Sequence, residues 1–288
     1  MMKSGVVFLF SLTIKAKNDT TPVIMTAFRE APRLREVRLS GASLRWISLP
    51  WTQLTQLEFW DESTSRCFQV LKETPNLEVL DVHLPRRNME RLPSLQFPLT
   101  LPHLHTLKFA SDLYGELLDH LVPPALKTIH LPVLLGMGTT AFTDLGVRSA
   151  WSLQSIHLSD MTVNDCTACL RSLSSVTHVH VGVKTSNFTS YDMDELIALF
   201  DKDKKILPAL ETLVIRDCGT EVPAWRLRKM LESRTTRARD GEVKLKTFRL
   251  DFGRHAPVAL KEFVEGLWLE LLPVIDAGLE VSIDFPSV

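Results

Sequence analysis

Cysteine, net charge and long apolar runs are all scarce in this sequence. Its 288 residues include four cysteines, and 33 basic residues stand against 34 acidic ones, for a net charge of −1. A chain this close to neutrality has no overall attraction to nucleic acid or to anionic lipid. No run of about 20 apolar residues occurs, so no segment has the length and hydrophobicity that spanning a bilayer requires. We therefore predict an ordinary soluble globular protein that binds neither nucleic acid nor membrane.

The few cysteines are too scattered to form a disulfide framework in a chain of this length, which favours a reducing compartment. We therefore expect a cytoplasmic or nuclear protein. Cys166 and Cys169 have the C-x-x-C spacing of a redox site or of half a zinc site. No second pair of ligands follows at usable spacing. We interpret the pair as the buried side of a helix, with a redox or metal site as the alternative.

Catalytic motifs are missing as well. The sequence has no Walker loop, no G-x-G-x-x-G after a strand, no G-x-S-x-G and no H-E-x-x-H. We therefore expect neither an enzyme nor a cofactor-binding protein. The densest basic run, WRLRKMLESRTTRAR at 225–239, is interpreted as a helix on the convex side of the fold, followed by a solvated loop. A phosphate or nucleic-acid patch is the alternative.

One apolar pattern, L-x-x-L-x-L, recurs along the chain. In PALETLVI it is formed by Leu210, Leu213 and Ile215. Nine windows carry it, and their 27 frame residues, meaning the three apolar positions of each window, are all Leu, Ile, Val or Phe. The windows are 32–39, 52–59, 75–82, 102–109, 124–131, 151–158, 174–181, 208–215 and 243–250.

The spacing of the frame residues predicts short strands. The last two frame residues of a window are two positions apart, so both point to one face of a strand. Five windows have proline two residues before the first frame residue, where it ends a preceding helix. Apolar residues recur at three- and four-residue spacing between the windows, which predicts helices. These helices are expected at 67–73, 116–121, 166–173, 193–200 and 226–232.

Strand–turn–helix units of about 26 residues cannot bury their apolar face alone, so they stack on one another. We predict an α/β leucine-rich-repeat solenoid, a horseshoe with a parallel concave sheet, helices on the convex side and about nine irregular repeats. A doubly wound α/β domain is the alternative, but it does not repeat one strand frame nine times. One continuous domain is expected, with a capping strand and helix at 1–31, repeats at 32–260 and a capping helix and strand at 261–288.

Several phrases resemble the leucine-rich-repeat region of F-box proteins from mushroom-forming fungi. They are APRLREVRLSG, LPWTQLTQLEF, LKETPNLEVLDV, LPHLHTLKF and MLESRT, and the resemblance covers roughly residues 20–285. In that family an F-box helix bundle docks on the Skp–cullin ubiquitin-ligase core, and the repeat surface is thought to select the protein to be ubiquitinated. The resemblance therefore implies a substrate-selecting surface that binds a protein partner.

The chain departs from this family in two ways. Only 31 residues precede the first window, too few for an F-box, so a ligase adaptor is expected as a partner only if an F-box is encoded upstream. The asparagine or cysteine usual three residues after the last strand leucine occurs only as Cys218. A free-standing leucine-rich-repeat binding protein with no ubiquitin role is therefore the alternative.

The N-terminal segment MMKSGVVFLFSLTIKAKND has two interpretations. Lys3 and the apolar run at 6–14 resemble a secretory signal, and Asn18 and Asn187 would then be glycosylation acceptors. No small-x-small cleavage site follows, however, and FSLTIKA alternates as a strand does. We favour a capping strand followed by a helix at 22–30, and a secreted protein is the alternative.

Residues between and beside the frame positions are expected to line the concave face and to contact the partner. Mixed charges, Trp and Arg are typical of protein-recognition surfaces. The predicted partner-binding residues are Arg38, Glu58, Trp60, Asp81, His83, Lys108, His130, His157, His178, His180, Arg216 and Arg249.

A metal site is the remote alternative for part of this face. His178 and His180 lie on one predicted strand and His157 on its neighbour, so three imidazoles are available for a zinc tetrahedron. No nearby carboxylate plainly orients these rings. We therefore interpret them as polar residues on a solvated sheet and expect no metal site.

Overall fold

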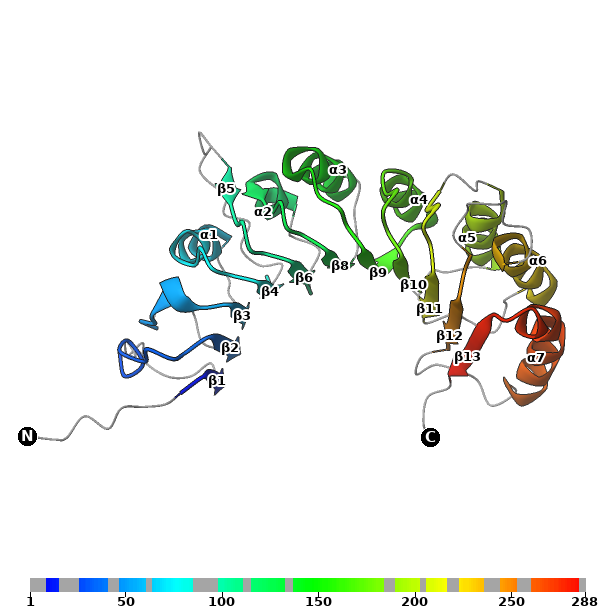
Figure 1. Ribbon diagram of the computed structural model, residues 1–288, viewed down its shortest axis with the longest axis horizontal. Helices are drawn as coiled ribbons and strands as arrows, with labels where there is room; N and C mark the ends of the chain where they lie inside the picture. The colour runs from blue at the N-terminus through cyan, green and yellow to red at the C-terminus, as the bar shows by residue number, and fades with distance from the viewer. Residues whose placement is uncertain are drawn as a thin grey trace, which may run out of the picture. The chain divides into compact units, whose positions relative to one another are not determined.

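The computed structural model describes residues 9–15, 26–40, 47–60, 64–84, 98–110, 115–132, 137–183, 190–202, 206–216, 223–235, 244–252 and 260–284. Strands and α-helices alternate along these segments, from β1 to β13 and from α1 to α7 (Figure 1). An 11-stranded sheet holds most of the strands in their sequence order, and the pairings are parallel. The prediction of an α/β protein with a large parallel sheet is confirmed.

The chain forms two compact units. Unit 1 comprises residues 1–129 and 140–151, and unit 2 comprises residues 130–139 and 152–288. Both units contribute residues to β8 (Thr128–Pro132) and to α3 (Met137–Ser149). Within each unit, the helices lie along one side of the sheet (Figure 1).

The elements of unit 1 are β1 (Ser11–Lys15), β2 (Glu36–Ser40), the 3-10 helix η2 (Trp51–Gln53), β3 (Gln56–Trp60), α1 (Thr64–Glu73), β4 (Val79–His83), β5 (Leu99–Thr100), β6 (Thr106–Phe109), α2 (Gly115–Asp119) and β7 (Leu121–Val122). Those of unit 2 are β9 (Ser155–Met161), α4 (Val163–Arg171), β10 (His178–Val183), α5 (Ser190–Lys202), β11 (Thr212–Arg216), α6 (Ala224–Thr235), β12 (Thr247–Asp251), α7 (Leu260–Asp276) and β13 (Glu280–Asp284). Strands β5 and β7 pair with each other in a separate two-stranded sheet.

The frame residues form the core of each unit. Every one of them is buried, and Phe109, the most accessible, is only 5% exposed. Equivalent frame residues pair in register, as Leu57 does with Leu80 and Leu213 with Phe248. Burying an aliphatic or aromatic side chain of this size contributes about 1.5–3 kcal/mol. The repeated apolar pattern is therefore the main source of stability that the sequence supplies.

One backbone hydrogen-bond pattern recurs at the start of the strands. The carbonyl of the residue after the first frame residue accepts two N–H bonds from the next window. The Arg35 carbonyl accepts from Thr55 and Gln56, at 2.9 and 3.1 Å, and the Thr55 carbonyl accepts from Glu78 and Val79, at 2.8 and 3.0 Å. Unit 2 repeats the pattern at Gln154, Thr177 and Glu211. Successive windows thus adopt the same local structure as well as the same sequence pattern.

Side-chain amides and hydroxyls add bonds between neighbouring windows. The Gln53 amide donates to the carbonyls of Ala31 and Leu34, at 2.6 and 2.9 Å. The Ser175 hydroxyl donates to the Leu153 carbonyl at 2.8 Å. These bonds satisfy carbonyls at the corners where the chain turns into a strand, which otherwise cost free energy when buried.

Helix boundaries have identifiable local causes. Thr162 caps α4, since its hydroxyl oxygen accepts from the Asp165 N–H at 3.2 Å and its hydroxyl donates to the Asp165 carboxylate at 2.7 Å. At the end of α7, Gly278 has a φ of +95°, which a residue with a side chain rarely adopts. The Leu279 N–H then reaches the Val274 carbonyl at 3.1 Å and leads the chain into β13.

The helices predicted between windows lie in α1, α2, α4, α5 and α6. The predicted terminal strand and the final helix and strand are β1, α7 and β13. The helix expected at 22–30 is not seen in its described part, because residues 27–30 form turns. Residues 1–8, Asn18, Asn187 and Cys218 lie outside the described residues.

Candidate functional site

The surface of the sheet opposite the helices carries the predicted partner-binding residues, and we call it the open face. Its residues alternate with, or directly flank, the buried frame residues along each strand. In parallel strands, side chains in register lie about 4.8 Å apart. In unit 1 the middle residues of successive strands are in register, and so are those of unit 2. These columns are Arg38, Glu58, Asp81 and Lys108 in unit 1, and His157, His180, Val214 and Arg249 in unit 2.

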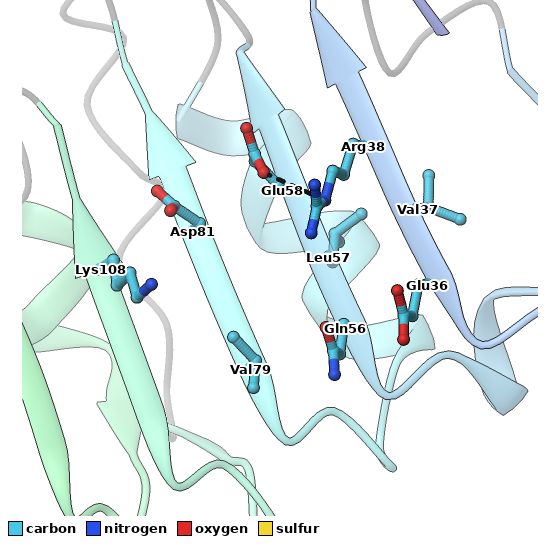
Figure 2. A pocket seen from close by; sticks show the side chains of 9 residues that line it. All are labelled: Glu36, Val37, Arg38, Gln56, Leu57, Glu58, Val79, Asp81 and Lys108. Atoms are coloured by element: carbon cyan, nitrogen blue, oxygen red, sulfur yellow. Dashed lines mark ion pairs between the residues drawn. The ribbon is translucent and has the colours of Figure 1, made fainter. Parts of the chain in front are cut away.

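A polar pocket lies on the open face of unit 1 (Figure 2). Arg38 on β2 reaches toward Glu58 on β3, and the side chains of Asp81 and Lys108 follow on β4 and β6 (Figure 2). The pocket is lined by Glu36, Val37, Arg38, Gln56, Leu57, Glu58, Val79, Asp81 and Lys108. Its charges of both signs give the surface directional contacts suited to a protein partner.

The charges in this pocket are only partly neutralised within the chain. Arg38 Nε lies 3.5 Å from Glu58 Oε2, and these side chains are 60% and 40% exposed. Ion pairs this exposed contribute less than about 1 kcal/mol. Glu58 and Asp81 are directly opposite in register, an arrangement that places like charges side by side at a cost. These side chains are therefore available to exchange their contacts for those of a partner.

Beside the pocket, Trp60 stacks on His83. The ring centroids are 4.4 Å apart and the planes differ by 12°. His83 Nε2 lies 3.2 Å from Asp81 Oδ1, so the imidazole is held from two sides. Trp60 nevertheless remains 51% exposed. The result is a large, oriented aromatic surface on the open face.

Three imidazoles form a continuous stack on the open face of unit 2. His130 and His157 have ring centroids 3.8 Å apart and planes 7° apart, and His157 and His180 have the same separation with a 24° difference. The in-register pairing of β9 and β10 aligns the second pair. Aromatic contacts of this kind contribute about 0.5–1.5 kcal/mol each beyond area burial.

The stack does not have the geometry that the metal hypothesis needs. The lone pairs of imidazole nitrogens lie in the ring plane, so nearly parallel rings direct them along parallel planes and not toward one point. His178 stands apart from the stack, and its Nδ1 lies 2.8 Å from the Thr177 hydroxyl. Among the described residues, no group of three or more His, Cys, Asp or Glu is placed to hold a metal ion.

His180 is electrostatically distinct within the stack. Burial, and then the nearby charges of Arg216, His178 and Arg249, together lower its pKa to about 4. Its Nδ1 is buried and has no hydrogen-bond partner in the structure. At neutral pH this ring is therefore uncharged, and the groups around it create a positive local potential.

The two arginines of the unit 2 face differ in their pairing. Arg249 forms an ion pair with Asp284 on the adjacent strand β13. Arg216 is exposed, and no carboxylate in the described part of the chain pairs with it. Val214, on the same strand as Arg216, points outward but is only 4% exposed.

The C-x-x-C pair is buried in α4, as the sequence indicated. Burial raises the pKa of the Cys166 thiol to about 12, and the neighbouring Asp165 carboxylate adds to this rise. The pKa of Cys169 is raised further for the same main reason. Both residues are free cysteines within the apolar core. Thiols in this state are poor nucleophiles and poor metal ligands.

The basic run on α6 is occupied by contacts within the chain. Arg226 lies 2.7 Å from Asp194, and Arg228 lies 2.9 Å from Glu270. Arg234 donates to the carbonyls of Phe200 and Ile206. These contacts favour the interpretation of α6 as a structural helix, while residues 236–239 lie outside the described part.

Sequence reasoning placed these residues on one face but missed how they combine. The Trp60–His83 stack follows from in-register pairing of β3 and β4, which a sequence pattern alone does not align. Asp284 was missed because candidate site residues were taken only from the repeat windows, although a capping strand was predicted at the end of the chain.

No helix in the described segments has the length and apolar character needed to cross a lipid bilayer. No protein-family model matches the sequence, and no curated protein matches it either. The function is therefore argued from the open face itself.

Proposed function

We propose that this chain is a leucine-rich-repeat scaffold that recognises a protein partner through its open face. The observation that carries this proposal is Trp60, which is half exposed, stacked on His83 and adjacent to the polar pocket of unit 1. Tryptophan and arginine are enriched among residues that dominate binding energy. A rigid aromatic surface loses little conformational entropy when a partner covers it.

The repeated architecture supports this proposal. Buried apolar frame residues and the same backbone hydrogen-bond pattern in successive windows build the sheet from similar units. Because the frame residues are buried in the core, the outward residues can differ in charge and polarity from strand to strand while the fold stays the same. Stacked repeats characteristically present such extended surfaces for binding.

By its resemblance to F-box proteins, the open face acts as the substrate-selecting surface of a ubiquitin-ligase receptor, with an intracellular partner. The second candidate function is that of a free-standing binding protein with no ubiquitin role. The polar, mixed-charge open face supports both, because both require a protein-recognition surface. They differ only in whether an F-box is joined to this region.

Two exposed tryptophans allow a matched test of recognition. Trp60 lies on the open face, whereas Trp225 lies on α6, is 56% exposed and contacts Arg226. Peptides are selected from a random display library on the wild-type chain, and their Kd values are measured against Trp60→Ala and Trp225→Ala. We expect Trp60→Ala to weaken binding about 30-fold, as the loss of a hot spot of about 2 kcal/mol predicts. Trp225→Ala should change Kd less than about twofold, as for a residue outside the interface.

Equal losses for the two variants, or selected peptides insensitive to Trp60, would show that the open face is not the recognition surface. Circular dichroism of both variants checks that neither substitution alters the fold. The substitutions remove the same side chain, so a general effect of losing a surface tryptophan is controlled.

The ligase role is tested separately at the 5′ end of the native transcript. An in-frame F-box upstream of this region, together with co-purification of a Skp-type adaptor with the longer product, supports the receptor role. A verified translation start at Met1 with no adaptor bound contradicts it and supports the free-standing binding protein. The recognition test above is unaffected by either result.

A further inference from the structure

The open face of unit 2 contains a patch in which positive and imidazole groups occur without carboxylates. We define the β9–β11 patch as the nine outward positions of the three strands β9, β10 and β11. Its residues are Ser155, His157, Ser159, His178, His180, Gly182, Thr212, Val214 and Arg216. None of these positions is Asp or Glu, whereas the pocket of unit 1 includes three carboxylates.

Arg216 is the one formal positive charge among these nine positions. Its in-register neighbour on β10 is Gly182, which has no side chain to pair with the guanidinium. Its neighbour on β12 is Asp251, but the two side chains form no ion pair in the structure. Arg249, which lies two residues before Asp251 on β12, already forms an ion pair with Asp284. Arg216 therefore presents its donors to solvent.

Acidic side chains lie at two edges of the patch and limit its extent. Asp160 is exposed at the bulge of β9, where its φ is 54°, and Asp251 lies on β12. Between these boundaries, His180 lies close enough to Arg216 for the two side chains to interact electrostatically. Burial is the main cause of the lowered pKa of His180, and the charges of Arg216, His178 and Arg249 act in the same direction.

We propose that the β9–β11 patch binds carboxylate side chains of an acidic segment in the protein partner, with Arg216 as the main contact and the adjacent histidine edges as further donors. This proposal rests on the proposed function and assigns the chemistry of the partner to one part of the open face. Guanidinium groups bind carboxylates through two parallel hydrogen bonds, which gives direction as well as attraction. Charge complementarity of this kind selects partners and speeds their association.

The proposal is tested with fluorescein-labelled octa-glutamate, using octa-glutamine as the neutral control. Fluorescence anisotropy is measured near neutral pH and at about 20 mM salt, where screening is weak. The wild-type chain is expected to bind octa-glutamate and to bind octa-glutamine at least about tenfold more weakly. Adding salt to about 300 mM should weaken the octa-glutamate complex, because exposed charges are screened.

Three variants locate the site. Arg216→Gln is expected to weaken octa-glutamate binding about tenfold, the loss of one charge-assisted hydrogen bond. Arg226→Gln removes the same charge from helix α6, where Arg226 is paired with Asp194, and should change binding less than about twofold. His180→Gln, which keeps a polar side chain but breaks the stack, is expected to weaken binding by an intermediate factor.

Equal loss in Arg216→Gln and Arg226→Gln would mean that net charge, not the patch, attracts the peptide, and it overturns the proposal. Absence of octa-glutamate binding, or equal binding of octa-glutamine, also overturns it. These outcomes are separate from failure of the proposed function. If library-selected peptides still depend on Trp60, recognition by the open face stands and only the assignment of an acidic segment to unit 2 is wrong.

Discussion

Imidazole groups on the open face have different roles that depend on their immediate neighbours. His83 is held between Trp60 and Asp81, so it orients an exposed aromatic ring. His180 lies at the end of a histidine stack and is surrounded by positive groups. The residue type alone does not distinguish these two cases. The distinction arises from which side chains the parallel register places beside each ring.

The pKa of His180 gives a residue-level prediction. Its folded pKa is about 4, below the ordinary value of 6.5, so the unfolded chain takes up the proton first as pH falls. The stability that this group contributes is therefore full above about pH 6.5 and is lost as pH falls toward 4. In an NMR titration, the His180 ring signals should stay constant from neutral pH to about pH 5 and move near pH 4.

Arg216→Gln provides an internal check on the cause of this shift. Removing the nearby guanidinium should raise the pKa of His180 part of the way back, because burial remains as the larger cause. Arg38→Gln in unit 1 should leave the His180 titration unchanged. A wild-type His180 that titrates near 6.5 would contradict the packing described for the stack.

One half-buried side chain, Arg234, connects helices α5 and α6. Arg234 of α6 donates from Nε to the Phe200 carbonyl at 2.9 Å, and from both terminal nitrogens to the Ile206 carbonyl at 3.1 Å. The guanidinium thus satisfies carbonyls near the end of α5, which would otherwise lack donors. Leu207 has a φ of 54° in the same turn. This turn therefore relies on Arg234 for its conformation.

Replacing Arg234 by Met gives an element-level prediction. Met keeps the aliphatic length but removes all of the donors, so we expect the free energy of unfolding to fall by about 1–3 kcal/mol. Arg226→Met is the matched control on the same helix, because Arg226 makes only surface contacts, an ion pair with the partly exposed Asp194 and a contact with the exposed Trp225 ring. That variant should lose less than about 1 kcal/mol.

Urea denaturation followed by circular dichroism measures both effects. Similar losses in the two variants would contradict the stabilising role of Arg234. They would mean that its hydrogen bonds to carbonyls stabilise the fold no more than a surface ion pair does. A loss only in Arg234→Met agrees with it.

The sequence predicts the strands of this fold better than it predicts the helices. Frame residues have one dominant requirement, which is burial on one face of a strand. Each of the nine windows leads into a strand, and all of its frame residues are buried. Helix α3 was not predicted, because its MGTTAFTDLGVRS sequence contains two glycines and several threonines, which have low helix propensity. Its formation depends on tertiary contacts such as that of Phe142 with Trp151.

The candidate site was predictable as a set of residues but not as an arrangement. Alternation along each strand places Arg38, Trp60 and His157 on the open face without knowledge of the structure. The stacks and ion pairs need the register between strands, and that register depends on turns and loops of unequal length. For the same reason, the sequence did not show that His157 and His180, two of the three histidines of the remote zinc alternative, form a stack that includes His130 and leaves His178 outside.

At the scale of the whole molecule, each unit places its apolar core and its polar outward residues on different sides of the sheet. Frame residues and helices enclose the core, while the outward residues of the strands carry charge, imidazole and aromatic groups. In unit 1 these groups are a polar pocket and an exposed Trp60, and in unit 2 they are a histidine stack and Arg216. Function should therefore respond to substitutions on the open face that leave the fold intact.

Side-chain footprinting by hydroxyl radicals tests this central claim most directly. The oxidation rates of Trp60 and Trp225, which are similarly exposed in the free chain, are compared with and without a library-selected peptide bound. We predict that the bound peptide protects Trp60 and leaves Trp225 unchanged. Protection of Trp225 with Trp60 still freely oxidised would place the partner on the helical side and contradict the assignment of recognition to the open face.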